Sequence, residues 1–399
     1  MNGGTTAGSG IHVRLFGRTD VGQIREHNED NFLVADLTRK SRSLMETDRE
    51  QRVAERGTVL GVCDGMGGAA AGEVASQLAV DIIYEKLTQG DAPRNHDDLA
   101  RRLVNSVEEA GGRIFGEARA DRTRRGMGTT ATIAALLDNR LFVAQVGDSR
   151  AYLLRGDKFV QISRDQSLVN QLIEAGQLTE EEAETFEHNN IILQALGTAE
   201  TVQVDLTFVD LRKGDTLLVC SDGLSGMVRA DEMREVLLAN REPFDACKEL
   251  VDRANRAGGH DNITVIVAVF DGDLPTAAGG DVLAYQKYAL PEAPAEQTVR
   301  APSVQSSPEV YTPPPSQEAQ RESRRLRVGH TMVGMTNPMA ATPASGTPTA
   351  PRVSNPPPTF GVDDDPVSIP TTGLPPSLVG MMVLGAMLFV AIAGFLLLR

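Results

Sequence analysis

Cysteine is scarce in this chain, which has only three among 399 residues, at positions 63, 220 and 247. They are widely spaced and odd in number, which argues against a disulfide framework and for a reducing compartment. Basic stretches are also lacking: the longest is the cluster Arg324-Arg325-Leu326-Arg327, and the net charge is −15. This balance argues against a nucleic acid partner.

Proline is nearly absent from the first two thirds of the chain. Only Pro93 and Pro243 precede Pro275, so 19 of the 21 prolines fall in the last third. Residues 1–10 are polar and glycine-rich, which predicts a disordered start without a signal peptide. Residues 273–376 hold proline clusters, serine and threonine without an apolar period, which predicts a disordered linker. Residues 11–272 are therefore the expected folded domain.

The C-terminal residues 377–398 are uncharged and mostly aliphatic. The 21 residues from Leu378 to Leu398 would form a helix about 31 Å long, close to the hydrocarbon thickness of a bilayer. We predict a transmembrane helix that makes this a single-pass, tail-anchored membrane protein with its domain in the cytoplasm. Within the linker, residues 329–336 follow the arginine cluster and are either unstructured or a docking or phosphorylation motif.

Short apolar runs rich in β-branched residues alternate with helical periodicity between residues 11 and 272. The strands are expected over 57–63, 130–136, 141–146, 149–154, 159–162, 215–220 and 262–270. Helices are expected over 72–87, 99–118, 168–175, 233–238 and 246–257. Arg155-Gly156-Asp157 predicts a hairpin turn. Strands outnumber those of a regular βαβ alternation, which favours an α+β fold of packed antiparallel sheets flanked by helices.

Acidic residues follow the apolar runs at several places. Two runs end in Asp-Gly, at Asp64-Gly65 and at Asp222-Gly223, and a core strand delivers its last side chain to a fixed point. Other acids stand near strand ends, at Asp30, Asp148, Asp165 and Asp261, and all of these but Asp165 are beside glycine or asparagine. Converging carboxylates repel one another unless cations neutralise them. Because the ligands are all oxygen, magnesium or manganese is favoured over zinc.

A pair of magnesium or manganese ions is typical of enzymes that hydrolyse phosphate esters. Two hard divalent ions can activate a water for in-line attack on a phosphoryl group, so that no side-chain nucleophile is required. Arg25 stands five residues before Asp30 and could hold phosphate oxygens with its planar guanidinium. The alternative is an ordinary surface arginine in a loop.

The same residues occur in six ordered motifs. These are Asp20-x-Gly22-x-x-Arg25-x-x-Asn28-Glu29-Asp30, Asp64-Gly65-Met66-Gly67-Gly68, Gly126-Met127-Gly128-Thr129-Thr130, Val146-Gly147-Asp148-Ser149-Arg150, Ser221-Asp222-Gly223-Leu224 and Gly259-His260-Asp261-Asn262-Ile263-Thr264. In this order they resemble the motifs of the metal-dependent (type 2C) serine/threonine protein phosphatases. The resemblance covers residues 11–272 and none of the tail.

The resemblance implies a fold, a reaction and roles for residues. The fold would be a β-sandwich of two antiparallel sheets flanked by helices (α-β-β-α). The reaction would be hydrolysis of phosphoserine and phosphothreonine on proteins. Near the membrane it would reverse the signalling of serine/threonine kinases, and its partners would be these kinases and their substrates. The catalytic residues would be Arg25, Asp30, Asp64, Asp222 and Asp261, with Arg25 on the phosphate.

The resemblance also implies two Mn²⁺ or Mg²⁺ ions and a third ion that is bound more weakly. Asp64 would bridge two ions, the Gly65 carbonyl would bind one, and Asp222 and Asp261 would complete the pair. Asp30 would act through water, and Asp148 would help Asp222 to bind the third. The segment from Ser163 to Gly197, which includes Asp165 and Gln166, would form a flap that shapes substrate access.

Two departures from the family pattern stand out. Met66 replaces a histidine of many eukaryotic members that is a proposed general acid, and in this respect the chain resembles bacterial members. Gln166 replaces a usual histidine in the flap, which makes substrate preference the least transferable property.

Four alternatives compete with this interpretation. Cys247 and Arg253 have the Cys-x5-Arg spacing of cysteine-dependent phosphatases, but no glycine lies between them to form a phosphate loop. Gly65-x-Gly67-x-x-Ala70 lacks the surrounding βαβ repetition of a dinucleotide site. A non-enzymatic scaffold with the same fold would be marked by the loss of a metal aspartate, and none is missing. A phosphatase dedicated to one regulator, such as a sigma-factor antagonist protein, also remains open.

Overall fold

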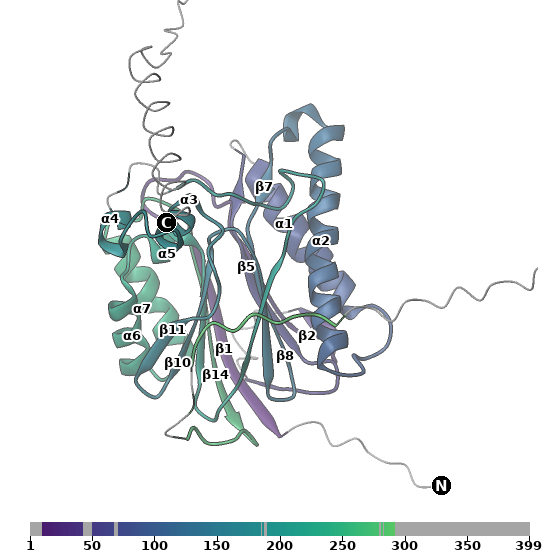
Figure 1. Cartoon of the computed structure of the whole chain (residues 1–399), viewed down its shortest axis with the longest axis vertical. Helices are drawn as coiled ribbons and strands as arrows, with labels where there is room; N and C mark the ends of the chain where they lie inside the picture. Colours follow the sequence, from purple (N-terminus) through teal and green to yellow (C-terminus); the bar gives the residue numbers. More distant parts are fainter. Residues whose placement is uncertain are drawn as a thin grey trace, which may run out of the picture. The chain divides into compact units, whose positions relative to one another are not determined.

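The computed structural model describes residues 10–42, 50–67, 71–184, 186, 190–278, 281 and 283–291. Within them, two six-stranded antiparallel sheets pack face to face (Figure 1). In spatial order, sheet A comprises β11 (Lys158–Gln161), β10 (Arg150–Arg155), β13 (Thr216–Cys220), β14 (Ile263–Gly272), β1 (Ile11–Asp20) and β4 (Glu50–Arg52). Sheet B comprises β12 (Asp205–Asp210), β9 (Arg140–Val146), β8 (Ala131–Leu137), β5 (Thr58–Cys63), β2 (Asn31–Asp36) and β3 (Ser41–Arg42). A small two-stranded antiparallel sheet pairs β6 (Gly65–Met66) with β7 (Gly128–Thr129).

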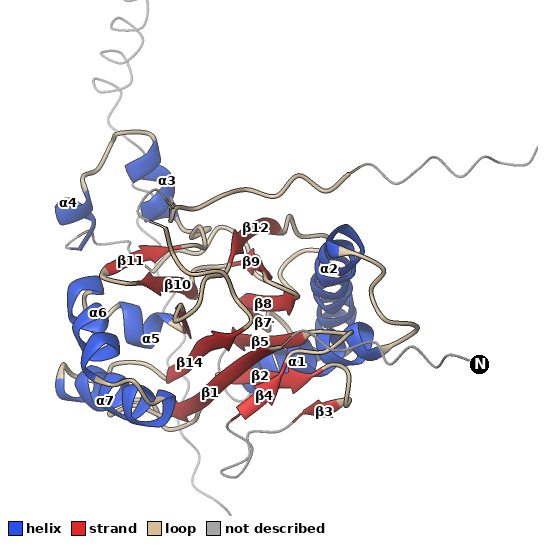
Figure 2. Ribbon diagram, turned by 90° about the horizontal axis from the view of Figure 1, so that it is seen from below, coloured by secondary structure: helices blue, strands red, loops and turns tan. Residues whose placement is uncertain are grey.

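Helices cover the outer face of each sheet (Figure 2). On sheet B lie α1 (Ala71–Thr88) and α2 (His96–Ala120), and on sheet A lie α5 (Asp222–Ser225), α6 (Ala230–Ala239) and α7 (Pro243–Arg256). Two short helices, α3 (Leu168–Glu174) and α4 (Glu180–Glu184), belong to the predicted flap, and a 3-10 turn spans Arg122–Arg124. The α-β-β-α sandwich expected from the sequence is confirmed.

Burial on both faces explains the continuous apolar runs of the central strands. In β5, Val59 points into the cluster between sheet B and its helices, whereas Leu60 points into the cluster between the sheets. In β8, Ala135 likewise points toward the helices and Ala134 toward the space between the sheets. A strand with no solvent-facing side cannot alternate between apolar and polar residues, so it appears in the sequence as an unbroken run.

The sequence prediction missed β1, β2 and β12, the strands β3, β4, β6 and β7 of only two or three residues, and the short helices α4 and α5. In β1 the buried residues alternate with partly exposed polar ones such as His12 and Arg14, and β12 carries acids at both ends. The predicted hairpin is confirmed, because Arg155 pairs with Lys158 and Gly156 has a φ of 63°, a value that suits glycine in a two-residue turn.

The folded chain continues past the predicted boundary at residue 272. β14 ends at Gly272, but residues 283–291, which we call the strap, lie along the domain, with Leu283 buried between the sheets. The predicted linker therefore begins with a packed segment.

The rest of the tail predictions are not covered by the structure. Residues 1–9 of the predicted disordered start, the linker from residue 292 onward with its segment 329–336, and the predicted transmembrane helix 377–398 lie outside the described residues. Among the residues that are described, no helix is both long and apolar enough to cross a bilayer.

A buried ion pair closes the end of sheet A where β10 finishes and β13 begins. Arg155 Nε and a terminal guanidinium nitrogen donate to the two carboxylate oxygens of Asp215 at 2.9 and 2.7 Å, and the two side chains are only 8% and 1% exposed. The same guanidinium also donates to the Asp210 carbonyl at 2.9 Å. One side chain thus joins β10, β13 and the end of β12.

We predict that Arg155→Met lowers the free energy of unfolding by about 3–5 kcal/mol, because it leaves the Asp215 carboxylate buried without its counter-ion. Lys213→Met is the control: it breaks the exposed pair with Asp271, at 3.3 Å and about half exposed on both sides, and should cost less than about 1 kcal/mol. Urea unfolding measures both values. Equal losses in the two variants would contradict the role given to Arg155.

Candidate active site

Strand register brings the predicted carboxylates to one end of the sandwich. In sheet B, Asn31 pairs with Cys63, so Asp30 and Asp64, one residue beyond each, lie side by side. In sheet A, Cys220 pairs with Val265, which places Asp222 and Asp261 near each other at the same end. Asp148 occupies the turn between β9 and β10, which belong to different sheets. Five aspartates from both sheets therefore converge.

Burial and mutual repulsion raise the pKa values of these acids. Burial raises the pKa of Asp30 to about 7; hydrogen bonds from Thr264 and Ser221 oppose this rise, and the charges of Asp222 and Asp261 add to it. Asp148 is buried too, and the charge of Asp222 helps to raise its pKa to about 7.

The other two carboxyls of the group follow the same pattern. Burial and the neighbouring charges of Asp30, Asp222 and Asp148 raise the pKa of Asp64 well above its usual range. The pKa of Asp222 is raised by burial and by Asp261. Only bound protons or cations can make such a cluster of acids stable.

Unpaired oxygens show where cations would fit. Within the described residues, the Oδ1 atoms of Asp30, Asp148 and Asp222 are buried and accept no hydrogen bond. The charge of Asp222 acts on Asp64, and among the described residues no group of three or more acids, histidines or cysteines is already arranged to hold a metal ion. Buried oxygens without donors are the groups that a hard divalent cation would satisfy.

The backbone of Asp64 is clamped by threonines of the neighbouring motif. Its N–H donates to Thr130 Oγ1 at 3.0 Å, and its carbonyl accepts from Thr130 N–H and Thr129 Oγ1, both at 2.8 Å. Thr130 Oγ1 lies 2.8 Å from Ser149 Oγ, one residue beyond Asp148. These contacts leave the Asp64 carboxylate free for the site while its main chain is fixed.

Two hydroxyls aim Asp30. Ser221 Oγ and Thr264 Oγ1 donate to Asp30 Oδ2 at 2.8 and 2.6 Å, which leaves Oδ1 as the unpaired oxygen. The sequence reasoning did not assign roles to Ser221 and Thr264, or to Thr129 and Thr130. Ser221 and Thr264 stand one and three residues from a predicted aspartate, and Thr129 and Thr130 end the third of the six motifs, so their positions in the motifs were the available signal.

Gly65 occupies a position that admits no side chain. A Cβ atom there would lie 2.3 Å from the Gly72 carbonyl oxygen and 2.5 Å from that of Glu29. Its antiparallel pairing with Thr129 in the two-stranded β6–β7 sheet holds the same backbone. The close approach of three main-chain segments therefore fixes the predicted carbonyl ligand directly after Asp64.

Arg25 lies at the rim of the carboxylate group. One terminal guanidinium nitrogen donates to Asp261 Oδ2 at 2.8 Å, and half of its side chain is exposed. Asn262 holds the loop that carries it, by donating to the carbonyls of Val21 and His27 at 3.0 and 2.9 Å and accepting from Glu29 N–H at 2.8 Å. The structure thus brings the predicted phosphate-binding residue to the predicted metal ligands.

The two predicted flap residues do not join this group. Asp165 accepts from Arg150 Nε and Gln161 Nε2, both at 2.7 Å, which uses both of its oxygens. Gln166 bonds the turn before Asp148: Gly147 N–H donates to its Oε1 at 3.1 Å, and its own N–H donates to the Gly147 carbonyl at 2.8 Å. Both residues hold the base of the flap rather than face the carboxylates.

The cysteines take no part in the site. All three are buried and free, and burial raises the pKa of the Cys220 and Cys247 thiols to about 12. Cys247 and Arg253 lie on the same helix, α7, and Arg253 pairs with Glu249 at 2.9 Å. A helix interior offers no loop of N–H groups for a phosphate, so the cysteine-dependent alternative is excluded.

Comparison with known proteins identifies the family. Residues 39–272, more than half of the chain, match the family model described as Protein phosphatase 2C. The chain belongs to the protein phosphatase 2C family. The matched residues include Asp64, Asp148, Asp222 and Asp261, while Arg25 and Asp30 precede them.

The chain is similar to bacterial protein phosphatase 2C relatives. It is 36% identical over 250 residues to the serine/threonine phosphatase stp of Listeria innocua, which covers 63% of this chain and 93% of that protein. The crystal structure of the Mycobacterium tuberculosis serine/threonine phosphatase PstP/Ppp matches with a TM-score of 0.56 and 35% identity, over 65% of this chain and 99% of that one. The bacterial type indicated by Met66 is confirmed.

A further solved structure holds metal. The catalytic domain of PstP in complex with two manganese ions matches with a TM-score of 0.54 and 34% identity, over 65% of this chain and 99% of that one.

We predict that Asp30→Asn raises the thermal midpoint of the metal-free protein at pH 8. The pKa of Asp30 rises from an ordinary 3.8 to about 7 on folding, so the wild-type chain loses stability as the pH increases from about 4 through about 7 and has lost all of that contribution at pH 8. The neutral amide avoids this loss and should gain at least about 2–4 °C at pH 8, with little change at pH 4.

The measurement is a thermal melt in EDTA across this pH range. Asp157→Asn, at an exposed aspartate of the hairpin turn, serves as the control and should follow the wild type at every pH. An Asp30→Asn midpoint that stays below the wild type at pH 8 would contradict the repulsion within the site.

Proposed function

We propose that residues 11–272 hydrolyse phosphoserine and phosphothreonine esters on proteins, with two divalent cations, Mn²⁺ or Mg²⁺, held by the converging aspartates. The observation that carries the proposal is the group of buried carboxylates from both sheets, three of which have an oxygen without a donor. The manganese complex of the related PstP domain supports the same metal.

Each predicted ligand has a local reason for its assignment. Asp64 would reach both ions from a backbone clamped by Thr129 and Thr130, and the Gly65 carbonyl, Asp222 and Asp261 would complete the pair. Asp30, aimed by two hydroxyls, would act through water, and Asp148 with Asp222 would take a third ion. The bound ions would supply positive charge that activates the attacking water and polarises the phosphoryl group.

Arg25 would bind the phosphoryl oxygens. Its guanidinium is half exposed and already lies 2.8 Å from Asp261 Oδ2, so a phosphate among the carboxylates would be within its reach. A planar fork suits two phosphate oxygens at once. Met66 has no proton to give to the departing seryl or threonyl oxygen, and a water near Asp148 would fill that role.

A membrane location is the second part of the proposal. The uncharged run 377–398 has the length of a spanning helix, and it would hold the enzyme on the cytoplasmic side, near membrane-bound serine/threonine kinases and their substrates. The residues between it and the strap would act as the tether.

For the activity, we expect the full chain to hydrolyse para-nitrophenyl phosphate and a phosphothreonine peptide when manganese is added. EDTA should abolish turnover, and Asp64→Asn or Asp222→Asn should lower kcat by at least about 100-fold, because the remaining acids cannot hold both ions. Asp157→Asn should retain wild-type rates. A folded, manganese-loaded wild type without turnover would favour the scaffold alternative, and full activity of Asp222→Asn would refute the two-metal site.

For the location, we expect the full chain in the membrane fraction after lysis, and a chain that ends at residue 376 in the supernatant. Both should turn over para-nitrophenyl phosphate at the same rate, since the deletion leaves the sandwich intact. Recovery of the full chain from the supernatant would refute the predicted helix.

A further inference from the structure

The strap adds strand-like pairing to the edge of sheet B. Phe208 N–H donates to the Gln286 carbonyl at 3.0 Å, and Tyr288 N–H donates to the Leu206 carbonyl at 2.7 Å. Lys287 therefore lies opposite Thr207 in an antiparallel bridge. This pairing uses backbone groups that an edge strand would otherwise leave open, which makes the strap a structural part of the domain.

Both ends of the strap are held. Leu283 is buried between the sheets. At the other end, the Tyr288 ring packs on Phe142 and Phe208 with centroids 5.0 and 5.3 Å apart, and Arg101 of α2 donates to the Pro291 carbonyl at 2.7 Å. The strap, green in Figure 1, thus runs from the core between the sheets across to α2.

Two side chains of the strap contact the buried carboxylate of Asp205 at the start of β12. The Tyr285 hydroxyl donates to Asp205 Oδ2 at 2.7 Å, and Lys287 Nζ lies 3.4 Å from Oδ1. Asp205 is only 6% exposed. A buried carboxylate without such partners is costly, so the strap and the start of β12 are fixed to each other.

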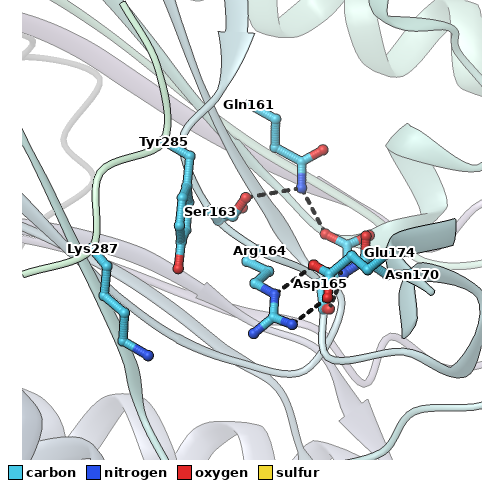
Figure 3. Close-up of a pocket in the computed structure, with 8 residues that line it drawn as sticks. All are labelled: Gln161, Ser163, Arg164, Asp165, Asn170, Glu174, Tyr285 and Lys287. Carbon is cyan, nitrogen blue, oxygen red and sulfur yellow. Dashed lines mark hydrogen bonds and ion pairs between the residues drawn. The ribbon is translucent and has the colours of Figure 1, made fainter. Parts of the chain in front are cut away.

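The same two side chains face the base of the flap across a polar pocket. The pocket has a volume of about 360 Å³, and Figure 3 shows Tyr285 and Lys287 on one side of it and Arg164, Asp165, Asn170 and Glu174 on the other. Arg164 Nε donates to Glu174 at 2.6 Å, and Asn170 donates to the Asp165 carbonyl at 2.9 Å. These bonds tie α3 to the flap base.

The residues just before Asp205 contact the flap base directly. Gln166 Nε2 donates to the Gln203 carbonyl at 3.1 Å, and Gln166 is bonded twice to Gly147, the neighbour of Asp148. Residues 203–205 therefore lie between the strap on one side and the flap base with the Asp148 turn on the other.

We propose that the strap is a positioning element that holds the base of the flap in the arrangement that accepts a phosphoprotein, with Tyr285 and Lys287 as its positioning residues. The inference rests on the proposed phosphatase function. A small aryl phosphate needs only the carboxylate end of the sandwich, whereas a phosphopeptide also passes the flap. Weakening the hold on Asp205 therefore changes the KM for peptides and spares the small substrate.

The test uses the full chain with saturating manganese and the double variant Tyr285→Phe, Lys287→Met. We expect the KM for a phosphothreonine peptide to rise about threefold to tenfold, the effect of losing ordinary hydrogen bonds, while kcat/KM for para-nitrophenyl phosphate stays within about twofold. Amide hydrogen exchange in residues 163–174 should become faster.

The controls separate this role from general stability. Lys287→Arg keeps the ion pair and should keep the wild-type KM, and Lys213→Met removes an exposed ion pair with Asp271 elsewhere on the domain and should change nothing. If the double variant fails to fold, Tyr285→Phe alone, which retains the ring and the lysine, provides the same comparison.

Two failures can be told apart. A wild-type chain that turns over neither substrate refutes the proposed function, and the exchange rates of residues 163–174 then still decide whether the strap holds the flap. An active wild type, with variants whose peptide KM and exchange rates are unchanged, overturns the positioning role alone. Equal losses on both substrates also overturn it.

Discussion

The repulsion among buried aspartates at one end of the sandwich is the constraint on which the rest of the site depends. Burial raises the pKa values of Asp30 and Asp148 to about 7, so at neutral pH the protein keeps acids where ionisation is unfavourable. Hydrogen bonds from Ser221 and Thr264 oppose the rise at Asp30 without removing it, and three oxygens of the group accept no hydrogen bond from the described residues. The fold therefore carries an instability that divalent cations would relieve.

The sandwich can hold such a group because its rigidity comes from elsewhere. The apolar clusters between the sheets and beneath the helices fix the strands, and Arg155 with Asp215 closes the opposite end of β10 and β13. Around the aspartates, hydroxyl and amide groups form hydrogen bonds with the main chain and with single carboxylate oxygens. Ser221 and Thr264, for example, both donate to one oxygen of Asp30. The contacts that stabilise the strands and the aspartates of the candidate site thus lie at different places along the same strands.

Much of this could be predicted from the sequence, for physical reasons. Strands buried on both faces, such as β5 and β13, appear as unbroken apolar runs, and the aspartates that follow them mark the site. Strand β1 was missed because its polar residues alternate with buried ones. The packing of the strap was missed because Tyr285 and Lys287 gain their contacts only from β12, about 80 residues earlier in the chain, and no local period shows such a pairing.

The positions of Asp165 and Gln166 change the role that these two residues have in the flap. The family resemblance assigned them to substrate access, yet Asp165 is saturated by Arg150 and Gln161, and Gln166 bonds Gly147 and Gln203. Where many relatives would carry histidine, an amide can donate and accept at once without titrating. The amide of Gln166 therefore bonds the Asp148 turn through Gly147 and the segment before Asp205 through Gln203 without changing its own charge with pH.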